Sequence, residues 1–280
     1  MAPAQRIADN VRIVNTLSSP VADEGPRPGD AYVQSFARGL AVLRSFGAHA
    51  PVQTLSEAAE RSGLTRAGAR RILLTLQQLG YVAQQGRQFR LTPKVLELGF
   101  AYLSSQPMWH LALPAMEALA AELGESCSAS VLDGDEIVYV LRVQASKIMA
   151  INLGVGSRLP AWCTSMGRVL LADLPPLERH ARLAAMPLRR LTPQTVTEPA
   201  HLADILEQVH QAGHAIVAGE LEDGLISMAA PIRNRSGRVV AAINVSGLAQ
   251  RTSVSEMRSR MLPRLLDTAA RINALMRLQD

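Results

Sequence analysis

Residues 54–80, TLSEAAERSGLTRAGARRILLTLQQLG, decide the fold of the first part of this chain. Thr54 or Ser56 can cap a short helix, and Gly63 supplies the break at its C-terminal end. Thr65 can cap a longer helix that runs to the glycine at the end of the stretch. A short helix, a glycine-containing turn and a longer helix predict a helix-turn-helix.

The flanking residues predict a winged form of this motif. Residues 33–46, VQSFARGLAVLRSF, place apolar side chains at helical spacing and predict a further helix before the motif. After it, residues 81–83 and 88–91 alternate around a glycine turn, which is typical of a small hairpin, or wing. We therefore assign residues 31–92 to a winged helix-turn-helix domain.

Positive charge is concentrated in the same segment. The chain of 280 residues carries 29 Lys+Arg and 24 Asp+Glu, a net charge of +5. Residues 31–92 hold eight arginines and two acids, whereas residues 93–280 hold 18 charges of each sign and residues 1–30 have a net charge of −1. A basic module beside a neutral one favours a polyanionic partner. A solvated basic surface without a partner is the alternative.

The longer helix of the motif indicates which side chains would contact double-stranded DNA. Its apolar residues fall on one side and its arginines on the other. The N-terminal part of such a helix enters the major groove, where arginine binds guanine or phosphate. Arginines of the first helix and of the wing are expected to contact the DNA backbone. The predicted DNA-binding residues are Arg38, Thr65, Arg66, Ala67, Arg70, Arg71, Arg87 and Arg90.

The rest of the chain predicts a tail, a linker helix and an α+β domain. Residues 1–30 are rich in Pro, Gly and Asp toward their end and predict a flexible tail. Residues 93–106 predict a linker helix whose apolar stripe serves either a dimer contact or core packing. Residues 107–280 predict strands with helices gathered between them, which indicates an α+β fold.

Several segments of this α+β domain are specific enough to predict one by one. Strands are expected on both sides of the Asp133-Gly134-Asp135 turn, at 147–153 and late in the chain. The late strands are expected at 214–219, 225–232 and 238–246. Helices are expected from Thr164, at 176–185, at 199–212 and at 254–278.

Composition and missing motifs exclude several classes of protein. No run approaches the roughly 18 apolar residues of a membrane span, and no secretory signal is recognisable. Two cysteines, Cys127 and Cys163, form no disulfide framework, and we expect a cytoplasmic protein. GxSxG, HExxH, P-loop and GxGxxG motifs are absent, so we expect no enzyme, no catalytic residue, no metal and no cofactor.

Longer stretches resemble the IclR family of bacterial transcription factors. They include YVQSFARGLAVLRSFG, the helix-turn-helix above, SCSASVLDGDEIVYV, RLPAWCTSMGRVLLA and GLISMAAPIRNRSGRVVAAINVSG, and the resemblance covers about residues 31–278. It is closest to the Pca/Pob branch, which regulates the β-ketoadipate pathway and aromatic-acid catabolism. The resemblance implies a GAF-like α+β effector-binding domain, a small organic or aromatic acid as effector, and dimers that often pair into tetramers.

The resemblance also implies an effector site against the sheet of the second domain. A loop leading into a helix would close it, with free N–H groups and hydroxyls that favour an anion. Arg158 or Arg168 could add a guanidinium fork, or Arg168 could simply point to solvent. The implied effector-binding residues are Trp162, Thr164, Ser165, Met166, Gly167, Ser227, Asn244 and Ser246.

One departure and three alternatives accompany this assignment. Some family members have an acidic residue where this chain has Val217, so their glyoxylate-type or pyruvate-type ligands are not carried over. Ser227, Asn244 and Ser246 could instead face solvent or bond locally on their strands. A DNA-binding or architectural protein without a metabolite, and a hydrolase-like enzyme, are the other functions to weigh.

Overall fold

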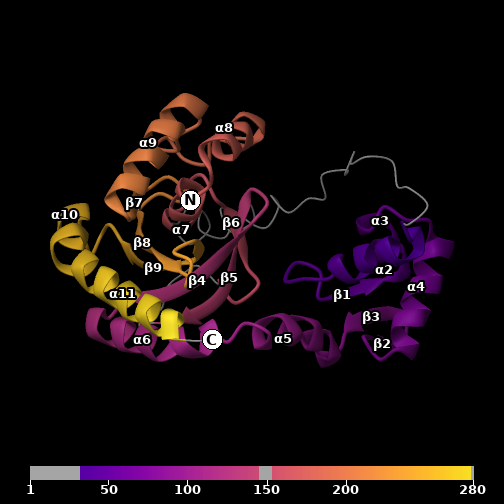
Figure 1. The fold of residues 1–280 in the computed structure, drawn as a ribbon. Coiled ribbons are helices and arrows are strands. Elements are labelled where there is room, and N and C mark those ends of the chain that lie inside the picture. The colour runs from indigo at the N-terminus through magenta and orange to yellow at the C-terminus, as the bar shows by residue number, and fades with distance from the viewer. Residues whose placement is uncertain (1–31, 145–152, 279–280) are drawn as a thin grey trace. The chain divides into compact units, whose positions relative to one another are not determined.

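The structure is a computed structural model and describes residues 32–144 and 153–278, drawn in Figure 1. Within these residues the chain divides between Gln106 and Pro107 into two compact units, each of which has its own core. The predicted tail at 1–30 and nearly all of the predicted strand at 147–153 lie outside the described residues.

The N-terminal unit is a winged helix-turn-helix, as predicted. Its three-stranded antiparallel sheet has the order β1-β3-β2. Its elements are α2 (Gln34–Arg44), β1 (Val52–Thr54), α3 (Leu55–Arg61), α4 (Arg66–Gln78), β2 (Val82–Gln85) and β3 (Gln88–Leu91). Buried apolar residues from these elements and from the turn after α2 make one core, which consists of Val42, Phe46, Ala58, Leu73, Leu76, Val82 and Phe89. The helical spacing of apolar residues therefore corresponds to burial for Leu73 and Leu76 of α4. Val33, Phe36 and Leu40, at the start of the first helix, are exposed instead.

Two threonines begin the helices of the motif. Thr54 is the N-cap of α3, and it forms a reciprocal capping box with Glu57. The Thr65 hydroxyl accepts a hydrogen bond from the Gly68 N–H at 3.1 Å and begins α4. Between the helices, Gly63 has a φ of +67°, a conformation that side chains with a Cβ rarely adopt.

A short 3₁₀ turn, η1 (Pro93–Val95), leads into α5 (Leu96–Ser104), where the linker helix was expected. No residue of α5 is buried. Leu96 is 73% exposed and Phe100 is 69% exposed, and Leu98 and Tyr102 are also exposed. Among the described residues, the apolar side chains of α5 are therefore not packed into a core.

The C-terminal unit contains a six-stranded antiparallel sheet in the order β6-β5-β4-β9-β8-β7. The strands are β4 (Ser126–Asp133), β5 (Glu136–Val143), β6 (Arg158–Pro160), β7 (Ala215–Ala218), β8 (Leu225–Arg233) and β9 (Val239–Leu248). Sequence-distant β4 and β9 pair at the centre. The sequence gives no clear signal for β6, which is only three residues long.

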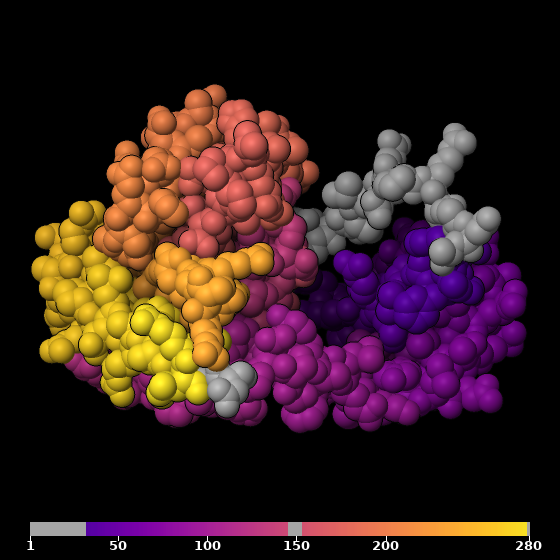
Figure 2. Space-filling view, viewed as in Figure 1, coloured from indigo at the N-terminus to yellow at the C-terminus, as the bar shows by residue number. Residues whose placement is uncertain are grey.

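Helices cover both faces of this sheet (Figure 1). The helix α6 (Met108–Leu123) packs with the C-terminal helical run, which consists of α10 (Val254–Glu256), a π-helical turn η2 (Met257–Met261) and α11 (Leu262–Leu278). The other face carries α7 (Ser165–Ala172), α8 (Pro176–Ala185) and α9 (Pro199–Ala212). The predicted helices at 176–185 and 199–212 are thus confirmed. In Figure 2, α9 and α11 lie at the surface, as orange and yellow atoms. No helix in the described ranges is long and apolar enough to cross a membrane.

Candidate functional site

A concave surface lies between α4 and the wing of the N-terminal unit. It has a volume of about 430 Å³, and three of the predicted DNA-binding residues, Arg66, Arg70 and Arg87, line it together. Ser56, at the start of α3, and Gln84 in the wing line it as well. The three arginines are exposed, so their guanidinium groups are open to a partner.

The other predicted DNA-binding residues lie outside this concave surface. Ala67 and Arg90 are exposed, on α4 and β3. Arg38 and Arg71 instead line a second hollow of about 690 Å³ between α2 and α4, whose walls are mostly apolar. The predicted residues therefore divide into those that line the concave surface at the wing, those that line the apolar hollow between α2 and α4, and those, such as Ala67 and Arg90, that line neither. The Thr65 hydroxyl already serves as a helix cap.

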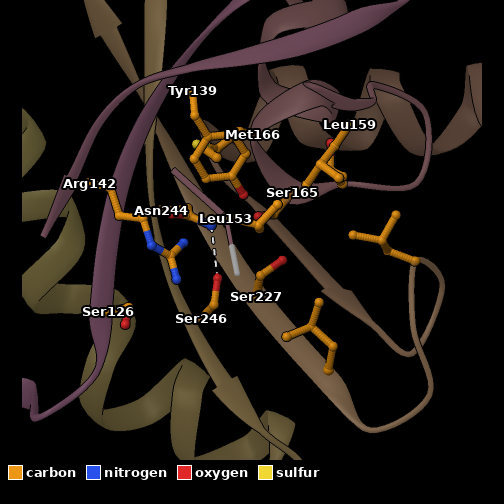
Figure 3. A pocket seen from close by; sticks show the side chains of 13 residues that line it. Ser126, Tyr139, Arg142, Leu153, Leu159, Ser165, Met166, Ser227, Asn244 and Ser246 are labelled. Atoms are coloured by element: carbon orange, nitrogen blue, oxygen red, sulfur yellow. Dashed lines mark hydrogen bonds between the residues drawn. The ribbon is translucent and has the colours of Figure 1, made fainter. Parts of the chain in front are cut away.

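A small cavity lies in the C-terminal unit between the sheet and the start of α7 (Figure 3). Its volume is about 30 Å³, which has room for a water molecule or two. Strands β4, β5, β6, β8 and β9, the N-terminal turn of α7 and the turn after β7 supply its walls. The lining residues are Ser126, Tyr139, Arg142, Leu153, Leu159, Thr164, Ser165, Met166, Leu221, Leu225, Ser227, Asn244 and Ser246.

Six of the eight predicted effector-binding residues line this cavity. On β9, the Asn244 Nδ2 donates to the Ser246 Oγ at 2.9 Å, and the Asn244 Oδ1 accepts from the Ser128 N–H at 3.2 Å. Ser227 lies opposite Ser246 in the β8–β9 register. Asn244 is 4% exposed, so the alternative that it faces solvent is wrong, although it does bond locally.

The first turn of α7 contributes two lining side chains and a helix cap. Thr164 is the N-cap; its hydroxyl accepts from the Gly167 N–H at 3.2 Å and donates to the Pro160 carbonyl at 3.0 Å. That hydroxyl is therefore already occupied. Ser165 and Met166 follow it along the cavity wall, where the N-terminal end of the helix dipole favours a negative charge.

Two predicted residues, Trp162 and Gly167, do not line the cavity. Trp162 is buried in the hydrophobic cluster behind it, and its carbonyl accepts a hydrogen bond from the Arg168 Nε at 2.9 Å. Gly167 packs against the backbone of Ala161, where an added Cβ would lie 2.1 Å from the Ala161 carbonyl oxygen. Both residues shape the turn before α7 rather than the cavity surface.

The two arginines suggested as a fork for the ligand are engaged elsewhere. Arg158 makes ion pairs with Asp133 and Glu136 at 2.7 and 2.6 Å. Arg168 is 3% exposed and makes a buried ion pair with Glu220. Neither arginine lines the cavity, and the suggestion that Arg168 points to solvent is wrong.

Sequence reasoning missed Arg142, the cavity's own arginine, and Tyr139 on the same strand. In the β4–β5 ladder, Ala129 pairs with Leu141 but Ser130 pairs with Tyr139, so β5 carries one extra residue. Such a bulge interrupts the alternation of a strand and re-aims the side chains that follow it. Tyr139 and Arg142 therefore both reach the cavity, although a regular strand would send them to opposite faces (Figure 3).

Two polar atoms at this cavity are buried without a hydrogen-bond partner among the described residues. They are the Nε of Arg142 and the hydroxyl oxygen of Ser165, which is 1% exposed as a residue. Leaving a buried polar group unsatisfied costs roughly 1–3 kcal/mol, so each such group calls for a partner. A carboxylate, which accepts from both guanidinium N–H and hydroxyl groups, matches the pair.

Burial also favours the neutral forms of Tyr139 and of the two buried cysteines. It raises the pKa of the Tyr139 phenol to about 12, with the positive charge of Arg142 acting in the opposite direction. Burial also raises the pKa of the Cys127 and Cys163 thiols to about 12. Tyr139 is therefore a neutral hydroxyl at pH 7, and neither cysteine is a ready nucleophile. Within the described residues, no three His, Cys, Asp or Glu side chains form a metal-binding group.

Comparisons with known proteins agree with both units. A family model described as the IclR helix-turn-helix domain matches residues 35–86, and one described as the bacterial transcriptional regulator IclR C-terminal domain matches residues 100–274. The chain is 41% identical to the Pca regulon regulatory protein of Pseudomonas putida over 236 residues, 84% of this chain and 81% of that protein. It is 33% identical to the p-hydroxybenzoate hydroxylase transcriptional activator of Acinetobacter baylyi, over 92% of this chain and 97% of that protein.

A solved structure extends the likeness to three dimensions. An IclR homologue from Microbacterium hydrocarbonoxydans, complexed with 4-hydroxybenzoate, is 27% identical and superposes with a TM-score of 0.78 over 88% of this chain and 100% of that one. The resemblance in the sequence, including its Pca/Pob branch, is confirmed. The chain belongs to the IclR family of bacterial transcriptional regulators.

Proposed function

We propose that this protein is a DNA-binding transcriptional regulator controlled by a small aromatic acid that binds in the C-terminal cavity. The observation that carries the proposal is the pair of unsatisfied polar atoms there, Arg142 Nε and Ser165 Oγ. Two related proteins agree with this proposal. One is named as a transcriptional activator for p-hydroxybenzoate hydroxylase, and the solved structure of the other contains 4-hydroxybenzoate. Such a regulator acts on operator DNA in the bacterial cytoplasm and catalyses no reaction.

The cavity walls match an aromatic acid in their chemistry. Arg142 can donate to the carboxylate, and the apolar side chains of Leu159, Met166 and Leu221 can contact a ring. The Ser165 hydroxyl, at the N-terminus of α7, can form a hydrogen bond with a second polar group of the acid. A cavity of about 30 Å³ is too small for a benzoate, so the acid must bind a more open conformation and stabilise it. That shift would be the signal.

The concave surface at the wing is the proposed contact with operator DNA. Arg66 and Arg70, near the start of α4, would read bases or phosphates in the major groove, and Arg87 would hold the backbone. The salt dependence of binding would report these contacts, because each neutralised phosphate releases counterions.

We also propose that the protein works as a homodimer, in which α5 supplies part of the contact. Leu96, Leu98, Phe100 and Tyr102 are exposed on this helix, and large apolar side chains grouped in this way mark interaction surfaces. Sedimentation equilibrium tests this: Phe100→Glu should raise the dimer dissociation constant at least tenfold. An unchanged constant would place the dimer contact elsewhere, and a wild-type monomer would refute the dimer.

Isothermal titration of the full chain with 4-hydroxybenzoate, protocatechuate, β-ketoadipate and shikimate tests the acid-binding proposal. We expect saturable binding of at least one aromatic acid and no change in the acid itself. If no acid on the panel binds while operator DNA still does, the protein is a DNA-binding protein without this class of effector. If the acid is converted, the protein is an enzyme.

A further inference from the structure

A buried ion pair lies beside the effector cavity without lining it. The Nη2 of Arg168 lies 2.6 Å from the Oε2 of Glu220, and the two side chains are 4% and 10% exposed. Desolvation offsets much of the attraction in such a pair, so a buried ion pair is weak evidence of a gain in stability. Its role is better explained by the segments of the chain that it holds together.

Each partner of the pair also holds the backbone of another segment. The Arg168 Nε donates to the carbonyl of Trp162 at 2.9 Å. The Glu220 Oε2 accepts from the Val196 N–H at 3.1 Å, and the Thr195 hydroxyl donates to the Glu220 carbonyl at 2.6 Å. The pair therefore joins α7 and the turn before it to the turn after β7 and to the segment before α9.

Two of these joined segments are walls of the effector cavity. Ser165, one helical turn before Arg168, lines it, and so does Leu221, which directly follows Glu220. We propose that Arg168 and Glu220 are positioning residues that set the spacing of these two walls and thereby determine which acids the pocket accepts. This inference rests on the proposed acid-binding function.

The test removes both charges at once, because a single substitution would leave the other charge buried and unpaired. The variant combines Arg168→Met with Glu220→Gln, which keeps an amide oxygen as an acceptor at position 220. A matched control combines Arg179→Met with Glu207→Gln. That pair, at 2.8 Å, joins α8 to α9 and lines no part of the cavity.

Two measurements on the full chain separate positioning from general stability. Hydrogen exchange without ligand should become at least tenfold faster at 164–166 and 221–225 in the Arg168/Glu220 variant, and not in the control. The dissociation constant of the larger acid, 4-hydroxy-3-methoxybenzoate, divided by that of 4-hydroxybenzoate should fall at least tenfold in the same variant, because the two walls are no longer held at a fixed spacing. A purely structural pair would change the melting temperature but leave this ratio unchanged.

Each outcome decides the inference. Unchanged exchange at the two walls, or an unchanged ratio in a folded variant that still binds both acids, would overturn it. Global unfolding of the double variant would show that the pair is a stability element and would also overturn it. If the wild-type protein binds neither acid, the proposed function fails. In that case, local exchange at the walls still decides whether the pair positions them.

Discussion

The substitution Arg142→Met tests the proposed effector site most sharply. Methionine has an unbranched side chain of similar reach, so it can fill the space of the aliphatic part of arginine without the guanidinium group. Because the Arg142 Nε lacks a partner among the described residues, the substitution removes no hydrogen bond made by that atom in the free protein. We therefore expect the free variant to be as stable as the wild type, or more stable.

The loss of acid binding can be estimated from the same observation. A hydrogen bond to a charged group contributes about 1.5–3 kcal/mol, so losing one should weaken binding about 30-fold at about 2 kcal/mol. At an acid concentration of about 100 times the wild-type dissociation constant, the ligand stabilises the wild type by about 2.7 kcal/mol. The same concentration should stabilise Arg142→Met by only about 0.9 kcal/mol.

Urea denaturation with and without 4-hydroxybenzoate measures both quantities. The control is Arg158→Met, which removes an arginine that pairs with Asp133 and Glu136 away from the cavity and should leave acid binding unchanged. If Arg142→Met keeps the full ligand-induced stabilisation, Arg142 does not bind the carboxylate. If Arg158→Met loses the ligand-induced stabilisation instead, Arg158 is the arginine that binds the carboxylate.

Three further predictions concern the DNA surface, the first turn of α7 and the buried thiols. Arg70→Ala should weaken operator binding about tenfold and flatten its salt dependence in anisotropy titrations, whereas Arg44→Ala, an exposed arginine outside the concave surface, should not. Gly167→Ala should lower the free energy of unfolding by about 3 kcal/mol in urea titrations, because the new Cβ would lie 2.1 Å from the Ala161 carbonyl oxygen; a loss below about 0.5 kcal/mol would contradict this packing. Burial raises the pKa of the Cys127 thiol to about 12 in the folded protein, so on a rise in pH the thiol ionises first in the unfolded chain. The free energy of unfolding should therefore fall as pH rises from about 9 toward 12. Cys127→Ala should make that fall smaller.

Local sequence signals predicted the N-terminal unit because they are strong there. The capping threonines Thr54 and Thr65 and the left-handed glycine Gly63 act within a few residues of their own positions. The helical spacing of apolar residues matches the buried residues of α4, which are Ala69, Leu73 and Leu76. Such features depend little on the rest of the chain, so sequence reasoning could predict them.

The effector cavity was predicted only in part, because long-range pairing builds it. Asn244 and Ser246 alternate regularly on β9, so the family resemblance led to the correct face. The bulge in β5 that directs Arg142 into the cavity is visible only once β4 and β5 are paired. Similarly, the ion pair of Arg168 could not be predicted from the sequence, because its partner Glu220 lies 52 positions away.

A titration of fluorescently labelled upstream DNA with the full-length protein, with and without 4-hydroxybenzoate, tests the central claim most directly. We predict tight binding with a steep salt dependence, about −0.9 in log K per neutralised phosphate, and an affinity that changes when the acid is added. Arg142→Met should bind the same DNA, but its response should need about 30-fold more acid than the wild type needs. Equal DNA affinity with and without every acid on the panel would contradict the account.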